Sequence, residues 1–174
     1  MIRDFIHIKN NFLNKEEAEE IIKLFINHTK KEYQNGNYLS FSFGDKPEFL
    51  NHKKLSFLKG RIQNELNFYL TLYPEASISM QLMEQRFKHW KPGNHFEEWH
   101  CEVTNKENMS RVLNFMIYLS SHNCGTQFFD KKIILSETGK LVMFPSYFTH
   151  THRGQVCPEN KDRYILSGYF RLTD

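Results

Sequence analysis

The sequence has few cysteines and no long apolar run. Its three cysteines, Cys101, Cys124 and Cys157, are odd in number and too few for a disulfide framework, which is typical of a reducing cytosol. No apolar run approaches the ~20 residues that a membrane-spanning helix needs. The charged start, Met-Ile-Arg-Asp, lacks the apolar segment of a secretory signal. We therefore expect a cytoplasmic protein with no membrane partner.

The composition is typical of a folded globular chain. Of its 174 residues, 25% are charged and 40% are hydrophobic. There are 16 phenylalanines and only four valines, so we expect aromatic rings, leucine and isoleucine to fill the core. The net charge of +3 is mild, and it permits weak attraction to nucleic acid or acidic surfaces without requiring it.

Two segments in the first half have helical periodicity. Apolar residues recur at helical spacing over about 18–26, shortly after Asn14, which we expect to cap the helix. A second periodic stretch runs from about Lys54 to Tyr73 and ends before Pro74. The sequence therefore predicts that residues 1–75 are mainly helical.

Beyond this half the sequence changes to short β-prone runs separated by turns. The runs are Ser79–Trp90, Glu98–Val103, Val112–Leu119, Thr126–Phe129, Lys140–Phe144, Phe148–His152 and Tyr164–Leu172. Many short strands with regular turns are typical of a sandwich or barrel. Because no repeat or linker interrupts the chain, we expect a single domain, 1–174, with a β core over 76–174.

A possible metal site begins with two residues of the β-rich half. His100 and Glu102 are two apart, so on a strand they would point to the same face. An imidazole and a carboxylate form two thirds of a facial triad that suits non-haem Fe(II), and a later strand would supply a second histidine. Taken alone, the pattern is more often an exposed strand with ordinary polar side chains.

A second group of polar residues follows about fifty positions later. His150 and His152 would share a face of the strand predicted there, so both are candidates for the second histidine. Arg163 shares a strand face with Ser167, and its guanidinium could bind a carboxylate through two hydrogen bonds. Taken alone, Arg163 would be interpreted as part of a surface salt bridge.

Together, these motifs resemble the 2-oxoglutarate/Fe(II)-dependent oxygenases of the prolyl 4-hydroxylase type over about residues 79–172. The motifs are Trp90-Lys91-Pro92-Gly93, Trp99-His100-Cys101-Glu102, Tyr118-Leu119, Gly125-Thr126-Gln127-Phe128, Phe144-Pro145, His152-Arg153-Gly154 and Arg163-Tyr164. The resemblance implies an α+β fold, in which N-terminal helices support a double-stranded β-helix core of the jelly-roll or cupin-like kind.

The resemblance also implies the metal ligands, which are His100, Glu102 and His152. Most relatives have aspartate where this chain has Glu102, whose side chain is one methylene longer. His150 stays open as the alternative to His152. Counting back from Arg163 favours His152, whereas counting forward from the Phe-Pro pair before it favours His150.

The cosubstrate residues implied by the resemblance come from three positions. Arg163 would hold the distal carboxylate of 2-oxoglutarate, and the hydroxyl of Tyr118 would touch the same carboxylate. Ser167 would line the cosubstrate pocket. The resemblance implies no catalytic residue beyond the metal ligands.

The activity implied is hydroxylation of a C–H bond by a dioxygenase that converts 2-oxoglutarate to succinate and CO₂. Its cofactors would be Fe(II) and 2-oxoglutarate, with ascorbate as an additional candidate. The implied target is a prolyl residue in a peptide or protein, and a free amino acid or another small molecule stays open as the substrate. The sequence does not indicate the oligomeric state.

Two other functions stay open at this point. One is a non-catalytic cupin-like protein that binds a metal or an acid. The other is a nucleic-acid oxidative demethylase. Those demethylases usually carry an asparagine and an arginine at the positions of Ile165 and Tyr169, which argues against nucleic acid as the partner.

Overall fold

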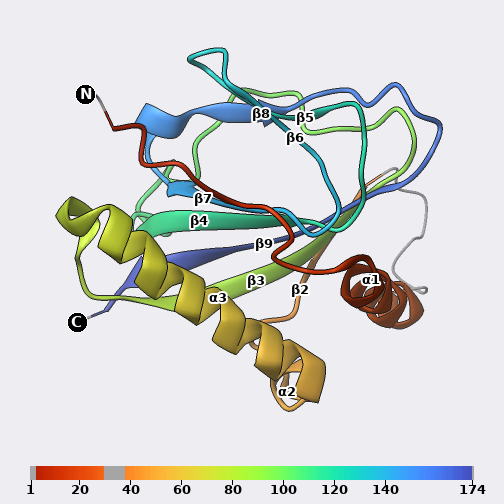
Figure 1. The fold of residues 1–174 in the computed structure, drawn as a ribbon, viewed down its shortest axis with the longest axis horizontal. Helices are drawn as coiled ribbons and strands as arrows, with labels where there is room; N and C mark the ends of the chain where they lie inside the picture. Colours follow the sequence, from red (N-terminus) through yellow and green to blue (C-terminus); the bar gives the residue numbers. More distant parts are fainter. Residues whose placement is uncertain (1–2, 30–37, 174) are drawn as a thin grey trace.

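The computed structural model of the chain describes residues 3–29 and 38–173. Helices and short strands alternate in its first part, and strands dominate the rest (Figure 1). In chain order the elements are β1 (His7–Lys9), α1 (Lys15–Thr29), β2 (Tyr38–Ser42), α2 (Pro47–Leu50), α3 (Lys53–Leu72), the 3₁₀ helix η1 (Pro74–Ala76), β3 (Met80–Trp90), β4 (Arg111–Tyr118), β5 (Gly125–Phe128), β6 (Ile133–Leu135), β7 (Leu141–Pro145), the 3₁₀ helix η2 (Phe148–His150), β8 (His152–Gly154) and β9 (Arg163–Leu172).

The strands form two antiparallel sheets. The larger sheet has the order β1-β7-β4-β9-β3-β2, and the smaller one has the order β6-β5-β8. Figure 1 shows α1 and α3 on one side of the larger sheet and β5, β6 and β8 on the other side. The larger sheet is therefore the middle layer of the molecule.

One face of the larger sheet packs against the helices. The rings of Phe25 in α1 and Phe87 in β3 stack with their centroids 4.8 Å apart. Leu66 of α3 and Phe115 of β4 are buried in the same cluster. Burying a side chain of this size typically contributes about 1.5–3 kcal/mol, so this layer supplies much of the stability of the fold.

The opposite face of the larger sheet is turned towards the smaller sheet. Met116 and Ile165 from that face pack with Phe128 of β5 in a second, smaller apolar cluster. Because side chains alternate between the faces of a strand, polar residues on this same face also point between the two sheets. This is the region that holds the site described below.

The capping of α1 confirms the prediction for Asn14. The side-chain oxygen of Asn14 accepts a hydrogen bond of 2.8 Å from the backbone N–H of Glu17. The Glu17 carboxylate in turn accepts one of 2.7 Å from the backbone N–H of Asn14. This reciprocal capping box fixes the start of α1. None of the helices in the described ranges is long and apolar enough to cross a membrane.

Two predicted strands are wrong. The run 98–103 forms no strand, and only a single bridge joins His100 to His152. In the run 148–152, residues Phe148–His150 form a 3₁₀ turn, so β8 begins only at His152. His150 and His152 therefore do not share a strand face, because the tight turn rotates the chain between them.

The structure also corrects the interpretation of the cysteines. Cys124 and Cys157 are joined by a disulfide that connects the start of β5 to the loop before β9. Cys101 is free. The two bonded cysteines are 33 residues apart, and nothing in that spacing indicated a pair.

Candidate metal and cosubstrate site

Three side chains converge between the two sheets. His100, Glu102 and His152 each offer a ligand atom, and these atoms lie within 4.8 Å of one another. The Oε1 atom of Glu102 is 3.8 Å from Nε2 of His100 and 3.6 Å from Nε2 of His152. Two histidines and one carboxylate at this spacing form a facial set that fits Fe(II).

Backbone hydrogen bonds hold the two histidine segments together. The N–H of His100 donates to the carbonyl of His152 at 3.0 Å, and the N–H of His152 donates back at 2.9 Å. This bridge replaces the predicted strand as the element that positions His100. It is long-range pairing, so the local sequence around His100 could not show it.

The second nitrogen of each imidazole is also anchored. Nδ1 of His100 is 3.0 Å from the carbonyl oxygen of Glu98, and Nδ1 of His152 is 3.0 Å from that of His150. A ring whose Nδ1 donates to a carbonyl keeps Nε2 as a lone-pair donor for a metal. Both rings are therefore oriented for binding through Nε2.

The carboxylate of Glu102 is held by a tyrosine. The hydroxyl of Tyr169, on β9, donates a hydrogen bond of 2.6 Å to Oε2 of Glu102. The guanidinium of Arg111 lies over the Tyr169 ring at 4.1 Å from its centroid. The hydrogen bond from Tyr169 anchors Oε2 of Glu102. The other carboxylate oxygen, Oε1, faces the two histidines and is available to a metal.

Electrostatics favour the protonation states that bind a metal. Burial, followed by the neighbouring charge of His100, lowers the pKa of His152 to about 4. Burial opposes ionisation of Glu102, but its pKa is lowered, chiefly by the charge of Lys88 together with the hydrogen bond from Tyr169. Near neutral pH the set therefore offers a neutral imidazole at His152 and an ionised carboxylate, as divalent metals require.

The three side chains line one end of a cavity of about 190 Å³, and Arg163 and Ser167 line it as well. Tyr118 does not line the cavity. Its hydroxyl donates a hydrogen bond of 2.7 Å to Oγ1 of Thr126, and Thr126 reaches the cavity in its place. Arg163 nevertheless acts on Tyr118 electrostatically. Burial raises the pKa of the Tyr118 hydroxyl, and the positive charge of Arg163 offsets part of that rise.

Several buried polar atoms on the cavity walls have no partner within residues 3–29 and 38–173. They are Nε of Arg163, Oγ of Ser167 and Oδ1 of Asn114. Arg163 is only 4% exposed, and one of its terminal nitrogens donates to the carbonyl of Gln155 at 3.4 Å. An unpaired buried polar group costs about 1–3 kcal/mol. A small dicarboxylate in this cavity would supply acceptors for the two donors among these atoms, Nε of Arg163 and Oγ of Ser167, so the residues present fit 2-oxoglutarate.

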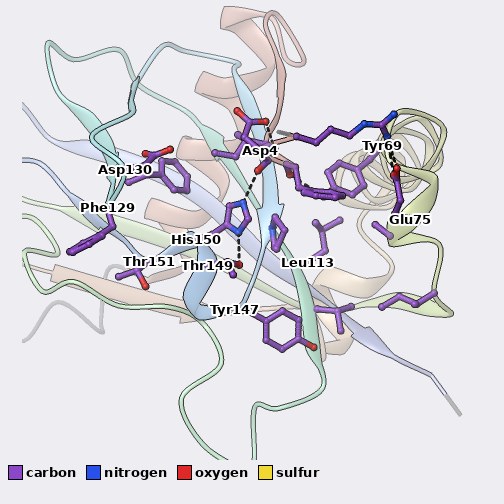
Figure 2. Close-up of a pocket in the computed structure, with 18 of the residues that line it drawn as sticks. Asp4, Tyr69, Glu75, Leu113, Phe129, Asp130, Tyr147, Thr149, His150 and Thr151 are labelled. Carbon is purple, nitrogen blue, oxygen red and sulfur yellow. Dashed lines mark hydrogen bonds and ion pairs between the residues drawn. The ribbon is translucent and has the colours of Figure 1, made fainter. Parts of the chain in front are cut away.

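His150 belongs to a different pocket. Its Nε2 donates to the backbone carbonyl of Asp4 at 2.7 Å, and its Nδ1 is 2.9 Å from the hydroxyl of Thr149 (Figure 2). That pocket, of about 620 Å³, is walled partly by the N-terminal segment. The structure therefore brings His152, and not His150, together with His100 and Glu102.

Sequence reasoning gave no role in the site to Thr126 or Tyr169, although Thr126 lies within one of the motifs. Alternation along β9 offered a signal for one of them, because Tyr169 has the same parity as Arg163 and Ser167. Thr126 has no such signal, since its place in the site depends on how β5 meets β8 across the sheet.

A family model provides the comparison by sequence. The model of the 2OG-Fe(II) oxygenase superfamily matches residues 85–171, which is half of the chain. The chain therefore belongs to the 2OG-Fe(II) oxygenase superfamily. No curated protein matches its sequence.

Solved structures are similar to the chain over nearly its whole length. The viral collagen prolyl hydroxylase of Paramecium bursaria Chlorella virus-1, in complex with 2-oxoglutarate, is 17% identical, with a TM-score of 0.72 over 97% of each chain. A prolyl-4-hydroxylase from Pseudomonas putida is 14% identical, with a TM-score of 0.72 over 98% of this chain and 94% of that one. A prolyl hydroxylase from Trichoplax adhaerens, bound to a hypoxia-inducible-factor peptide, is 14% identical, with a TM-score of 0.69 over 97% and 84%.

These findings confirm three predictions. The fold is α+β with a double-stranded β-helix core, and it is of the prolyl 4-hydroxylase type. The chain is a 2-oxoglutarate-dependent dioxygenase, an oxidoreductase whose cofactors are Fe(II) and 2-oxoglutarate. At these identities the structural likeness shows the fold alone, and it leaves the substrate to be argued separately.

Proposed function

We propose that this chain hydroxylates a prolyl residue of a peptide or protein, with Fe(II) held by His100, Glu102 and His152. One observation carries the proposal: the three ligand atoms converge in the same cavity as the buried guanidinium of Arg163, whose Nε has no partner among the described residues. A metal and an acid are accommodated together by this arrangement, as the reaction requires.

Arg163 acts at the far end of the cavity. Its guanidinium would pair with the distal carboxylate of 2-oxoglutarate, and the hydroxyl of Ser167 would add a hydrogen bond. Tyr118 would support this end through its hydrogen bond to Thr126 and its electrostatic contact with Arg163. These contacts fix the orientation of the cosubstrate relative to the three ligands.

The metal end of the cavity has a separate role. When bound, Fe(II) supplies the binding and activation of dioxygen that turn 2-oxoglutarate into succinate and CO₂ and oxidise the C–H bond. His100, Glu102 and His152 would hold the metal through three ligand atoms, which would leave room for the cosubstrate and oxygen to bind it as well. The apolar side chains of Met116 and Ile165 line the same cavity and would help to exclude bulk water from it.

The prolyl target is supported by the fold similarity to prolyl hydroxylases from three sources, one of them bound to a peptide. Two exposed rings lie beside the metal ligands and could contact a peptide. Phe96 is 41% exposed and packs on His100, and Trp99 is 39% exposed. Ascorbate is proposed as a reductant that keeps the iron ferrous during turnover.

The test is anaerobic titration of the protein with Fe(II) and 2-oxoglutarate, followed by the visible charge-transfer band of the chelate. We expect the band with the unaltered protein, its loss in His152→Ala and weaker binding of 2-oxoglutarate in Arg163→Met. Addition of oxygen and a proline-containing peptide should then release succinate. Absence of the band from the unaltered, folded protein would overturn the assignment of the site.

A further inference from the structure

A second set of cations faces the same cavity from β3. Arg86 and Lys88 are two residues apart, so they share the face that also carries Trp90. All three line the cavity of about 190 Å³ together with His100 and Glu102. Trp90 pairs with Arg163 in the sheet register, so Lys88 and Arg86 extend from the cosubstrate end of the cavity towards its metal end.

Arg86 has an incomplete set of partners. Its Nη2 donates to Oε2 of Glu84 at 3.2 Å, but its Nε is buried without a partner in the described ranges. Glu84 is already bound by two other arginines: Arg111 through two hydrogen bonds of 3.0 and 2.6 Å, and Arg171. Arg86 therefore shares the carboxylate of Glu84 with two arginines that bind it more closely, and its own Nε–H stays without an acceptor in the described ranges.

Lys88 has no hydrogen bond and no ion pair within residues 3–29 and 38–173. Burial lowers the pKa of its ammonium group, and Glu102 opposes this change while Arg86 adds to it. The positive charge of Lys88 is also the largest of the effects that lower the pKa of Glu102. An additional anion beside Lys88 would offset the cost of burying the ammonium group.

The proposed function does not supply that anion. The charge of a ferrous ion and that of the 2-oxoglutarate dianion cancel, and the charges of Glu102 and Arg163 cancel as well. Arg86, Arg111 and Arg171 share the single negative charge of Glu84, and Lys88 has no ion pair in the described ranges, so positive charge remains in excess in a partly enclosed cavity, where like charges repel strongly. With metal and 2-oxoglutarate bound, the cavity therefore still carries excess positive charge, which an anionic group of another molecule would neutralise.

We propose that Arg86 and Lys88 form a subsite for an anionic group of the substrate, a carboxylate or a phosphate, next to the C–H bond that is oxidised. The aromatic ring of Tyr38, which stacks on Trp90 at 4.9 Å and lines the same cavity, forms its outer wall. The inference rests on the proposed function and narrows it, because the substrate is then an acidic molecule or an acidic stretch of a peptide.

The experiment uses the protein loaded with Co(II) and 2-oxoglutarate, so that no turnover occurs. Inorganic phosphate, acetate and neutral acetamide are titrated separately, and binding is followed by calorimetry and by the visible spectrum of Co(II). We expect saturable binding of phosphate or acetate and none of acetamide. The tighter of the two anions identifies the chemical class of the group that is recognised.

Variants assign that binding to the two residues. Arg86→Met and Lys88→Met should each weaken anion binding at least 10-fold, and Lys88→Arg, which keeps the charge, should restore most of it. Lys23→Met, an exposed position on α1, should bind as the unaltered protein does. Should Arg86→Met fail to fold, the comparison of Lys88→Met with Lys88→Arg decides the matter.

The same titration separates the two proposals. If 2-oxoglutarate perturbs the Co(II) spectrum but neither anion binds, or binding is unchanged in both methionine variants, the anionic subsite is overturned and the proposed function stands. If 2-oxoglutarate itself leaves the spectrum unchanged, the assignment of the metal and cosubstrate site fails instead.

Discussion

The two pockets that contain His150 and His152 differ in how their polar groups are satisfied. The larger pocket, of about 620 Å³, is mostly apolar, and no buried polar side-chain atom of the described residues that line it lacks a partner (Figure 2). Arg3 binds Glu75 at 3.0 and 2.9 Å, and His150 donates to the carbonyl of Asp4. Among the described residues, no unpaired buried group in this pocket points to a ligand.

The smaller pocket, of about 190 Å³, has the opposite character. Buried polar atoms of Arg163, Ser167 and Asn114 have no partner in the described part of the chain. Each such group costs about 1–3 kcal/mol in the absence of a ligand. Unpaired buried polar groups therefore distinguish a binding site for a charged ligand from a gap in the packing. Of these two pockets, the one with the metal and cosubstrate residues is the smaller, so pocket volume alone would not have identified it.

The largest expected effect separates the two histidines. His152→Ala should reduce Fe(II)-dependent succinate formation to background and abolish Co(II) binding, because a facial set with one ligand removed loses most of its affinity. His150→Ala should change turnover by less than about 3-fold, and loss of its hydrogen bond should cost about 1 kcal/mol of stability. Calorimetric metal titration and a succinate assay measure both. Equal loss in the two variants would contradict the difference drawn between the pockets.

The second effect concerns the cosubstrate end. Arg163→Met should weaken 2-oxoglutarate binding by about 30-fold or more, since losing one partner of a buried charge pair typically costs about 2–5 kcal/mol. Metal binding should change little, because Arg163 contacts none of the three ligands in the described part of the chain. The dissociation constant is measured by anaerobic titration of the chelate band. Arg153→Met, at a residue whose guanidinium stacks on Trp99, serves as the matched control. An unchanged affinity for 2-oxoglutarate would remove Arg163 from the site.

A third effect follows from the pKa of His152. Its pKa of about 4 in the folded, metal-free protein lies below its ordinary value of 6.5, so the unfolded chain binds this proton more tightly. The free energy of unfolding should therefore fall as the pH decreases from about 6.5 to 4, by up to about 3 kcal/mol. Denaturant titrations of the metal-free protein at several pH values measure this slope. His152→Gln should flatten it, and His150→Gln should not. A slope that both variants share would assign the effect to other groups.

Sequence reasoning predicted well whatever depends on local pattern. The periodicity before Pro74 predicted α3, and the β-prone runs between turns predicted the long strands β3, β4 and β9 to within about one residue. The motif spacing predicted which polar residues would meet. It favoured His152 but left His150 open as the alternative, because the 3₁₀ turn over Phe148–His150 cannot be distinguished in sequence from a continuing strand.

Features that depend on long-range pairing were missed. The short strands β1, β2 and β6 have too few residues for a visible alternation, and their partners define them. The disulfide between Cys124 and Cys157 has no local signature either. Tyr169 was noted only as the residue in place of an arginine, since its hydrogen bond to Glu102 joins positions 67 residues apart.

That hydrogen bond leads to the smallest expected effect. Tyr169→Phe should weaken Co(II) or Fe(II) binding about 10–100-fold, the usual loss when a group that orients a ligand is removed. Glu102→Asp shortens the ligand by one methylene and should lose the same hydrogen bond, so Tyr169→Phe should cost much less in that background. Metal affinity, measured by calorimetry on the four proteins of this cycle, reports the coupling. Tyr164→Phe, whose hydroxyl donates to Asp162, is the control. If the two losses add in full, Tyr169 only packs beside Glu102. If they do not add, the hydrogen bond from Tyr169 is what sets the longer glutamate at the position of a metal ligand.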